Sequence, residues 1–174
     1  MTRALAILDT SVLVLLLTKK LDDSAKEVEA NRRREAVKAC LHEMQPKFRF
    51  AIPTVVIAEL TNGKAAQREV ERLVDSLGRF NILAFNYSAG CVAADMWRDA
   101  LSRKPIKDRQ VIKFDTLICA TAVAYGATRI ITENPGDFEK HILAVKANVE
   151  VVMPSVPPAK GQLKIFQIKP AKKK

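Results

Sequence analysis

Short apolar runs alternate with segments whose apolar residues recur at helical spacing along most of this chain. Uninterrupted apolar runs are typical of strands buried in a parallel sheet, and the helical period is typical of helices that cover such a sheet. The predicted strands are 4–8, 48–52, 80–85, 129–131 and 149–153. The predicted helices are 12–17, 24–44, 54–60, 65–77, 89–102 and 115–125.

The alternation of strands and helices predicts an α/β fold with three layers, α/β/α, around a central, mainly parallel sheet. In such sheets, ligands bind beyond the carboxyl ends of the strands. The 174 residues suit one domain. We expect this domain to span residues 1–153 and to be followed by a proline- and lysine-rich tail, 154–174.

Four acidic residues stand in nearly apolar surroundings, where a lone carboxylate is costly. Asp9 ends the first strand, Glu59 lies in the helix 54–60, Asp115 opens an apolar helix, and Asp137 follows the strand 129–131. Carboxylates that converge on one rim repel one another unless a cation neutralises them, and oxygen ligands suit Mg²⁺ or Mn²⁺. A site of this kind activates water and stabilises charge on a phosphoryl oxygen, so phosphodiester hydrolysis is the expected reaction.

Each acid taken alone also has a structural interpretation. Asp9, before Thr10 and Ser11, and Asp115, at a helix start, can act as helix caps. Asp137 can be an ordinary turn residue, whereas Glu59 is harder to explain structurally because it has no evident basic partner nearby in the sequence. The functional interpretation therefore depends on the order and settings of all four.

The charge of the chain is consistent with a polyanionic partner. The formal net charge is +10, and the last 21 residues contain six lysines and no acidic residue. A basic surface can hold nucleic acid, or it can simply be solvated. The same two possibilities apply to the arginine triplet 32–34.

The cysteines and the first apolar run bear on location. Cys40, Cys91 and Cys119 are far apart and odd in number, so we expect reduced core residues rather than disulfides or a zinc site. The apolar run 4–17 is interrupted by Asp9, Thr10 and Ser11, which argues against a membrane span or a signal peptide. A cytoplasmic protein without membrane contact is expected.

Three segments together resemble the PIN-domain nucleases and are most similar to the VapC-type ribonuclease toxins of toxin–antitoxin pairs. They are ILDTSVL, IPTVVIAEL and FDTLICATAVAYGATRIITENPGDF, and the resemblance spans roughly residues 4 to 153. It implies that Asp9, Glu59 and Asp115 are catalytic carboxylates that bind the metal.

The fourth ligand of the family has two candidates in this chain, Asp137 and Asn134. Many members have Asp where Asn134 stands, and others have Asn there and use the later Asp. We take Asp137 as the fourth catalytic and metal-binding residue and Asn134 as its polar neighbour. Ser11 and Thr132 look like hydroxyls that orient the carboxylates or metal-bound water.

The resemblance implies a Mg²⁺- or Mn²⁺-dependent endoribonuclease that acts on RNA, forms a homodimer and is blocked by a small antitoxin. Arg109, Lys113 and Lys107 flank the approach to Asp115 and are candidates to bind substrate phosphates, or they belong to a solvated loop. The long charged segment 24–44 and the lysine-rich tail depart from compact toxins. Two alternatives therefore stay open: a PIN ribonuclease of RNA processing and a non-catalytic RNA-binding module.

Overall fold

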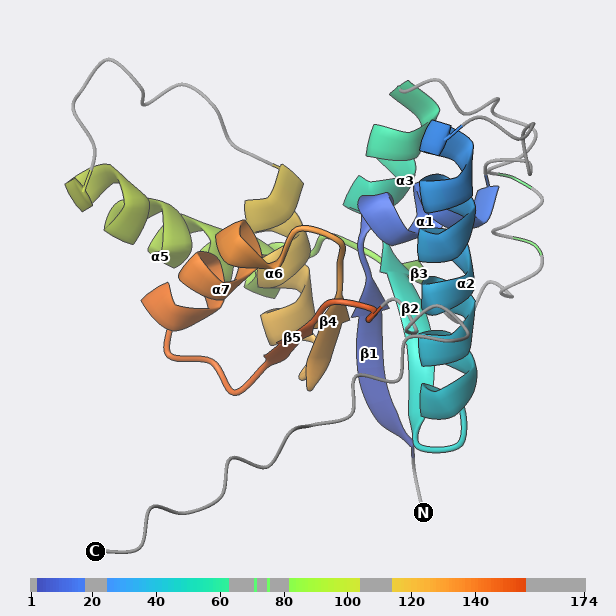
Figure 1. The fold of residues 1–174 in the computed structure, drawn as a ribbon. Helices are drawn as coiled ribbons and strands as arrows, with labels where there is room; N and C mark the ends of the chain where they lie inside the picture. Colours follow the sequence, from blue (N-terminus) through green and yellow to red (C-terminus); the bar gives the residue numbers. More distant parts are fainter. Residues whose placement is uncertain are drawn as a thin grey trace, which may run out of the picture.

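A five-stranded, all-parallel sheet forms the centre of the described part of the molecule, in the order β3-β2-β1-β4-β5 (Figure 1). The computed structural model describes residues 3–17, 25–62, 71, 75, 82–103 and 114–155. The strands are β1 (Ala4–Leu8), β2 (Phe48–Pro53), β3 (Ile82–Leu83), β4 (Arg129–Ile131) and β5 (Glu150–Val152).

Helices cover both faces of this sheet, so the prediction of a three-layer α/β/α fold is confirmed (Figure 1). In the described ranges they are α1 (Thr10–Leu17), α2 (Ala25–Met44), α3 (Thr54–Asn62), α5 (Tyr87–Arg103), α6 (Phe114–Ala124) and α7 (Pro135–Ala144). From β1 through β2 to β3, each new strand is added toward one edge of the sheet, and from β4 to β5 toward the other edge. Right-handed crossovers therefore place α1, α2 and α3 on one face and α5, α6 and α7 on the other.

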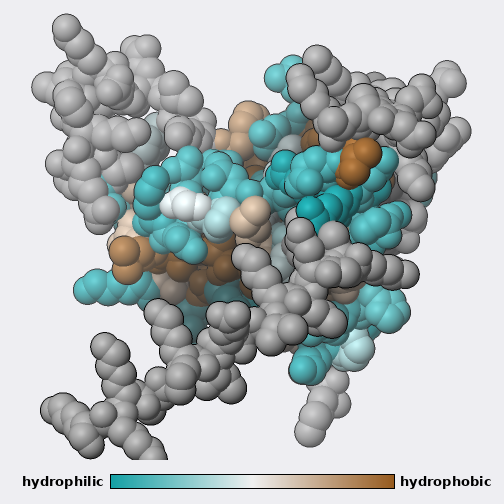
Figure 2. All heavy atoms as spheres, viewed as in Figure 1, coloured by the Kyte–Doolittle hydropathy of each residue, from teal (hydrophilic) through white to brown (hydrophobic). Residues whose placement is uncertain are grey.

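The central strand shows why these apolar runs become strands. In β1, the four residues Leu5, Ala6, Ile7 and Leu8 are all buried, because helices cover the strand from both faces. The outer surface of the molecule differs: α2 presents mainly hydrophilic side chains on the face seen in Figure 2. None of the helices in the ranges given above is long and apolar enough to cross a membrane.

The helix α7 was not among the predicted elements. Pro135 occupies the start of this helix, where its missing N–H costs nothing, and Phe138 and Ile142 lie one turn apart and are buried. Asp137 consequently lies in the first turn of a helix rather than in an ordinary turn.

Some boundaries also differ from those predicted, and some predictions fall outside the described residues. The predicted strand 80–85 ends at Leu83, and the predicted strand 149–153 is shorter at both ends. The predicted helix 65–77 lies outside the described residues except at positions 71 and 75, as does the tail from residue 156.

The arginine triplet of α2 is largely engaged by protein groups. Arg34 is buried and donates from Nε to the Leu15 carbonyl at 2.7 Å, which satisfies a carbonyl near the end of α1. Arg33 pairs with Glu133. These two side chains therefore anchor α2 to the rest of the fold instead of offering free phosphate-binding groups.

Candidate active site

The carboxyl ends of β1 and β4 lie side by side at the point where the sheet order reverses. The chain leaves β1 toward α1 on one face and leaves β4 toward α7 on the other (Figure 1). Asp9 directly follows β1, and its N–H donates to the Ile131 carbonyl at 3.0 Å. This switch point is where open parallel sheets place their ligand sites.

Asp9 is buried, with 5% of its surface exposed, and hydrogen-bond donors surround its carboxylate. Oδ1 accepts from the Thr10 N–H at 2.7 Å. Oδ2 accepts from Ser11 Oγ at 2.6 Å and from Thr132 Oγ1 at 2.8 Å. These donors offset the cost of burying the charge and fix the orientation of the carboxylate.

The helix-cap interpretation of Asp9 also has support. Its Oδ2 accepts from the Ser11 N–H, at 3.4 Å, in the first turn of α1. The side chain therefore caps α1 while it faces the sheet rim, and the two interpretations do not compete.

The hydroxyls of Ser11 and Thr132 tie Asp9 to the segment that follows β4. Ser11 Oγ accepts from the Glu133 N–H at 3.0 Å, and Thr132 Oγ1 accepts from the Asn134 N–H at 3.0 Å. Each hydroxyl thus donates to Asp9 and accepts from the backbone of residues 132–134. These contacts support the orienting role that the sequence predicts for both residues.

Glu59 reaches the same rim from α3. Its Oε2 accepts a 2.5 Å hydrogen bond from Thr10 Oγ1, and its side chain is partly buried. Thr10 therefore contacts both carboxylates, Asp9 through its N–H and Glu59 through its hydroxyl. The link between Thr10 and Glu59, 49 residues apart, is a tertiary contact that no local sequence pattern predicts.

Asp115 lies in the first turn of α6. The pKa of the buried Cys119 thiol, one turn further along this helix, responds to both Asp115 and Asp9. Burial raises the pKa of the Cys119 thiol most, and the negative charges of Asp115 and then Asp9 raise it further. Both carboxylates therefore act on the same buried sulfur, which links the start of α6 to the end of β1.

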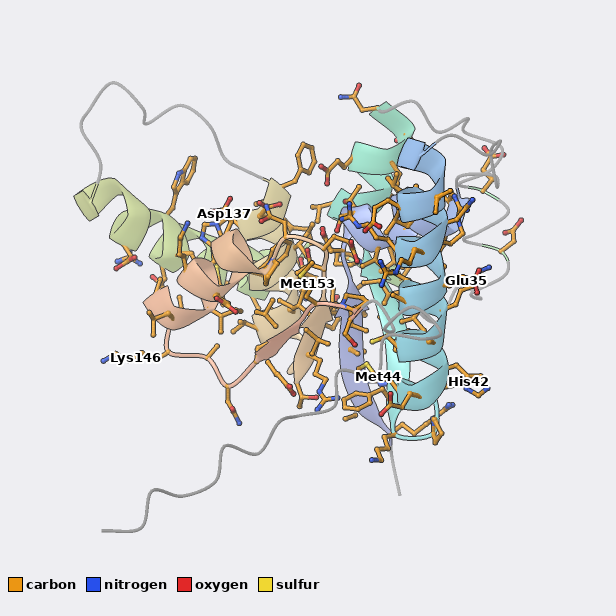
Figure 3. All side chains as sticks on the ribbon, viewed as in Figure 1. Glu35, His42, Met44, Asp137, Lys146 and Met153 are labelled. Atoms are coloured by element: carbon orange, nitrogen blue, oxygen red, sulfur yellow. The ribbon has the colours of Figure 1, made fainter. Side chains whose placement is uncertain are left out.

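Asp137 lies in the first turn of α7, the helix that packs against α6 (Figure 3). It forms an ion pair with Lys140 one turn further on, with Nζ and Oδ1 2.9 Å apart. Asn134, the competing candidate, is the exposed residue before α7, and its side chain makes no capping hydrogen bond to that helix.

Thr10 joins Asp9 and Glu59 at the rim, but the acids do not form a finished coordination cage in the described residues. Within the part of the chain that the structure describes, no three His, Cys, Asp or Glu side chains are grouped closely enough to hold a metal ion. The donors are nevertheless all carboxylate and hydroxyl oxygens, a set that fits a hard cation such as Mg²⁺ or Mn²⁺ and not a soft one.

Two further contacts at the site were missed from the sequence. His141 is partly exposed, and its Nε2 lies 3.2 Å from Oγ1 of Thr116, the residue that follows Asp115. Glu133 contacts Arg33, 100 residues away. The proposed phosphate-binding residues Arg109, Lys113 and Lys107 lie outside the described residues.

Comparison with known proteins identifies the family. The family model of the PIN domain matches residues 6–141, and the chain belongs to this family. Comparison with curated proteins gives no match.

Several solved structures share the fold. FitAcB from Neisseria gonorrhoeae has a TM-score of 0.58 at 20% identity, covering 86% of this chain and 97% of that one. VapBC2 from Rickettsia felis, bound to a DNA fragment from its promoter, has a TM-score of 0.57 at 20% identity, covering 86% and 98%. A toxin–antitoxin complex from Klebsiella pneumoniae has a TM-score of 0.53 at 23% identity, with the same coverage.

Proposed function

We propose that this protein is a metal-dependent endoribonuclease and the toxin of a VapC-type toxin–antitoxin pair. The observation that carries the proposal is the setting of Asp9, a buried carboxylate held by four hydrogen-bond donors at the switch point of a PIN-domain sheet. A carboxylate held so firmly at the ligand-binding rim is preorganised for a cation.

Asp9, Glu59, Asp115 and Asp137 would hold Mg²⁺ or Mn²⁺, and all four are catalytic residues in this proposal. A bound divalent cation supplies Lewis-acid stabilisation of the charge that develops on a phosphoryl oxygen. Ser11 and Thr132 keep the Asp9 carboxylate in one orientation, and Thr10 relates Glu59 to Asp9. Asn134 adds a polar group beside Asp137.

The substrate in this proposal is RNA. The net charge of +10 supports a polyanionic substrate, and steep weakening of binding by salt is expected. Arg109, Lys113 and Lys107 are the proposed phosphate contacts, because they precede Asp115 closely in the chain. Arg109 can bind a phosphate in a bidentate manner, whereas the two lysines act as point charges.

The proposed partners follow from the similar structures. The Klebsiella pneumoniae structure is a toxin–antitoxin complex, and its fold is shared by this chain. We propose a small antitoxin protein as the inhibitor, a homodimer as the assembly and the cytoplasm as the location.

Cleavage of a labelled RNA pool tests the proposal, with Asp9→Asn as the variant and Asp95→Asn as the matched control. Asp95 lies on α5, is exposed and pairs with Arg98 one turn away. We expect wild type and Asp95→Asn to cleave and Asp9→Asn to fold normally without cleaving. Cleavage by Asp9→Asn at the wild-type rate would overturn the proposal.

Expression in bacteria separates a toxin from a PIN ribonuclease of RNA processing. A toxin without its antitoxin should arrest growth, and the Asp9→Asn variant expressed to the same level should not. Normal growth with active wild-type enzyme in the cells would contradict the toxin assignment and leave the nuclease assignment standing.

A further inference from the structure

A partly buried ion pair joins α2 to the segment after β4. Arg33 Nε donates to Glu133 Oε2 at 2.7 Å, and Arg33 Nη2 contacts the same oxygen. The Glu133 side chain is only 6% exposed, whereas that of Arg33 is 43% exposed. A carboxylate buried to this degree depends on its partner, so the pair fixes where Glu133 lies.

The backbone of Glu133 belongs to the surroundings of Asp9. Its N–H donates to Ser11 Oγ, which in turn donates to Asp9 Oδ2. The preceding residue, Thr132, donates to the same Asp9 oxygen, and the following residue, Asn134, donates from its N–H to Thr132 Oγ1. One residue therefore binds α2 through its side chain and the Asp9 network through its backbone.

We propose that Glu133 is a positioning residue, which Arg33 of α2 holds so that Ser11 and Thr132 present the Asp9 carboxylate to a divalent cation. This inference rests on the proposed metal-dependent function. It gives the long charged helix α2 a part in the site: α2 anchors the loop that orients the carboxylate.

Glu133 acts through other residues and does not serve as a ligand. The Arg33 guanidinium neutralises the Glu133 carboxylate and contacts its Oε2 through both Nε and Nη2. The contacts separate the two neighbours: Thr132 donates to Asp9, while the Glu133 side chain binds Arg33 of α2.

The chain contains a matched control for this pair. Arg129 Nε donates to Glu150 Oε2, also at 2.7 Å, and joins two elements, β4 and β5. Arg129 begins β4, whereas Glu133 follows the end of β4. The control pair therefore has the same chemistry at the opposite end of the same strand, away from Asp9.

The test is Mn²⁺ binding by calorimetry on the full chain, for wild type, Glu133→Gln, Arg33→Gln, Arg33→Lys, Glu150→Gln and Asp9→Asn. We expect Glu133→Gln and Arg33→Gln to raise the Kd for Mn²⁺ about 3- to 10-fold, less than the roughly 10- to 100-fold typical of a direct partner of a ligand. Arg33→Lys, which keeps the charge, should recover part of the loss, and Glu150→Gln should match wild type. Thermal unfolding of each variant confirms that it is folded at the titration temperature.

The outcomes separate this inference from the proposed function. A Kd for Glu133→Gln and Arg33→Gln equal to that of Glu150→Gln, while Asp9→Asn loses Mn²⁺ binding, would overturn the positioning role alone. Asp9→Asn that binds Mn²⁺ as wild type does would overturn the metal site and, with it, this inference.

Discussion

The hydroxyl of Thr132 donates a 2.8 Å hydrogen bond to Oδ2 of Asp9, although 123 positions separate the two residues in the sequence. Both residues are buried. The bond joins the end of β4 to the end of β1, the two strands between which the sheet order reverses. The orientation of the central carboxylate therefore depends on a residue of a different strand.

Thr132→Val should weaken metal binding and leave the fold intact. Valine has nearly the same shape but no donor, so Asp9 keeps its bonds to Thr10 and Ser11 and loses one. We expect the Kd for Mn²⁺ to rise about 10-fold or more. Stability should fall by roughly 1.5–3 kcal/mol, as for a hydrogen bond to a charged group.

Calorimetry and urea unfolding measure the two effects of this substitution. Thr128→Val is the control, because Thr128 is exposed near the opposite end of β4 and its hydroxyl donates a long, 3.4 Å hydrogen bond to the Leu5 carbonyl. Equal Mn²⁺ affinity in the two valine variants would show that Thr132 does not orient Asp9.

Glu59→Gln should abolish most RNA cleavage without unfolding the protein. The glutamine carbonyl can still accept from Thr10 Oγ1, but it carries no charge for a cation. Removing one metal-binding carboxylate costs several kcal/mol of transition-state stabilisation, so the cleavage rate should fall at least about 100-fold. Glu139→Gln on the exposed side of α7 is the control, and a rate for Glu59→Gln close to that of Glu139→Gln would remove Glu59 from the site.

Asp137→Asn tests which residue fills the fourth ligand position. We expect cleavage to fall about 10-fold or more, because the proposal makes Asp137, in the first turn of α7, one of the metal-binding carboxylates. Lys140→Ala removes the ion-pair partner of Asp137 and should leave most of the activity, which separates loss of the carboxylate from loss of the ion pair. If Asn134→Ala is inactive and Asp137→Asn is active, the two assignments must be exchanged.

The pH dependence of stability should carry a contribution from Cys119. Burial raises the pKa of this thiol above its ordinary value of 9.0, so the folded state favours the neutral form. The contribution is complete below pH 9.0 and is lost as the pH rises above that value, because unfolding then releases a proton. Urea midpoints should therefore fall more steeply above this pH for wild type than for Cys119→Ala. Cys91→Ala, at an exposed position, should follow wild type, and equal slopes in all three proteins would contradict the raised pKa.

The strands and most of the helices could be predicted because their signals are local. The apolar runs of β1 and β4 and the apolar helix that begins beside Asp115 each form one element with nearly the predicted bounds. α7 was missed because Asn134, Pro135 and Gly136 look like a turn, although Phe138 and Ile142 already stand one helical turn apart.

The contacts that organise the site could not be predicted, because they join distant parts of the chain. No residue near Glu133 in the sequence indicates that Arg33 neutralises it. No residue near Thr10 indicates that its hydroxyl donates to Glu59. The order of the strands determines both pairs, since it decides which loops and helix ends meet at the rim.

The central claim is that a divalent cation held by the rim carboxylates is required to cleave RNA. The most direct test is cleavage of labelled RNA by one sample of the full chain, first with excess EDTA and then after addition of Mn²⁺ beyond the chelator. We predict that wild type does not cleave the RNA in EDTA and regains its cleavage rate with Mn²⁺, while Asp9→Asn cleaves under neither condition. Cleavage by wild type that persists in EDTA, or recovery of Asp9→Asn with Mn²⁺, would contradict the claim.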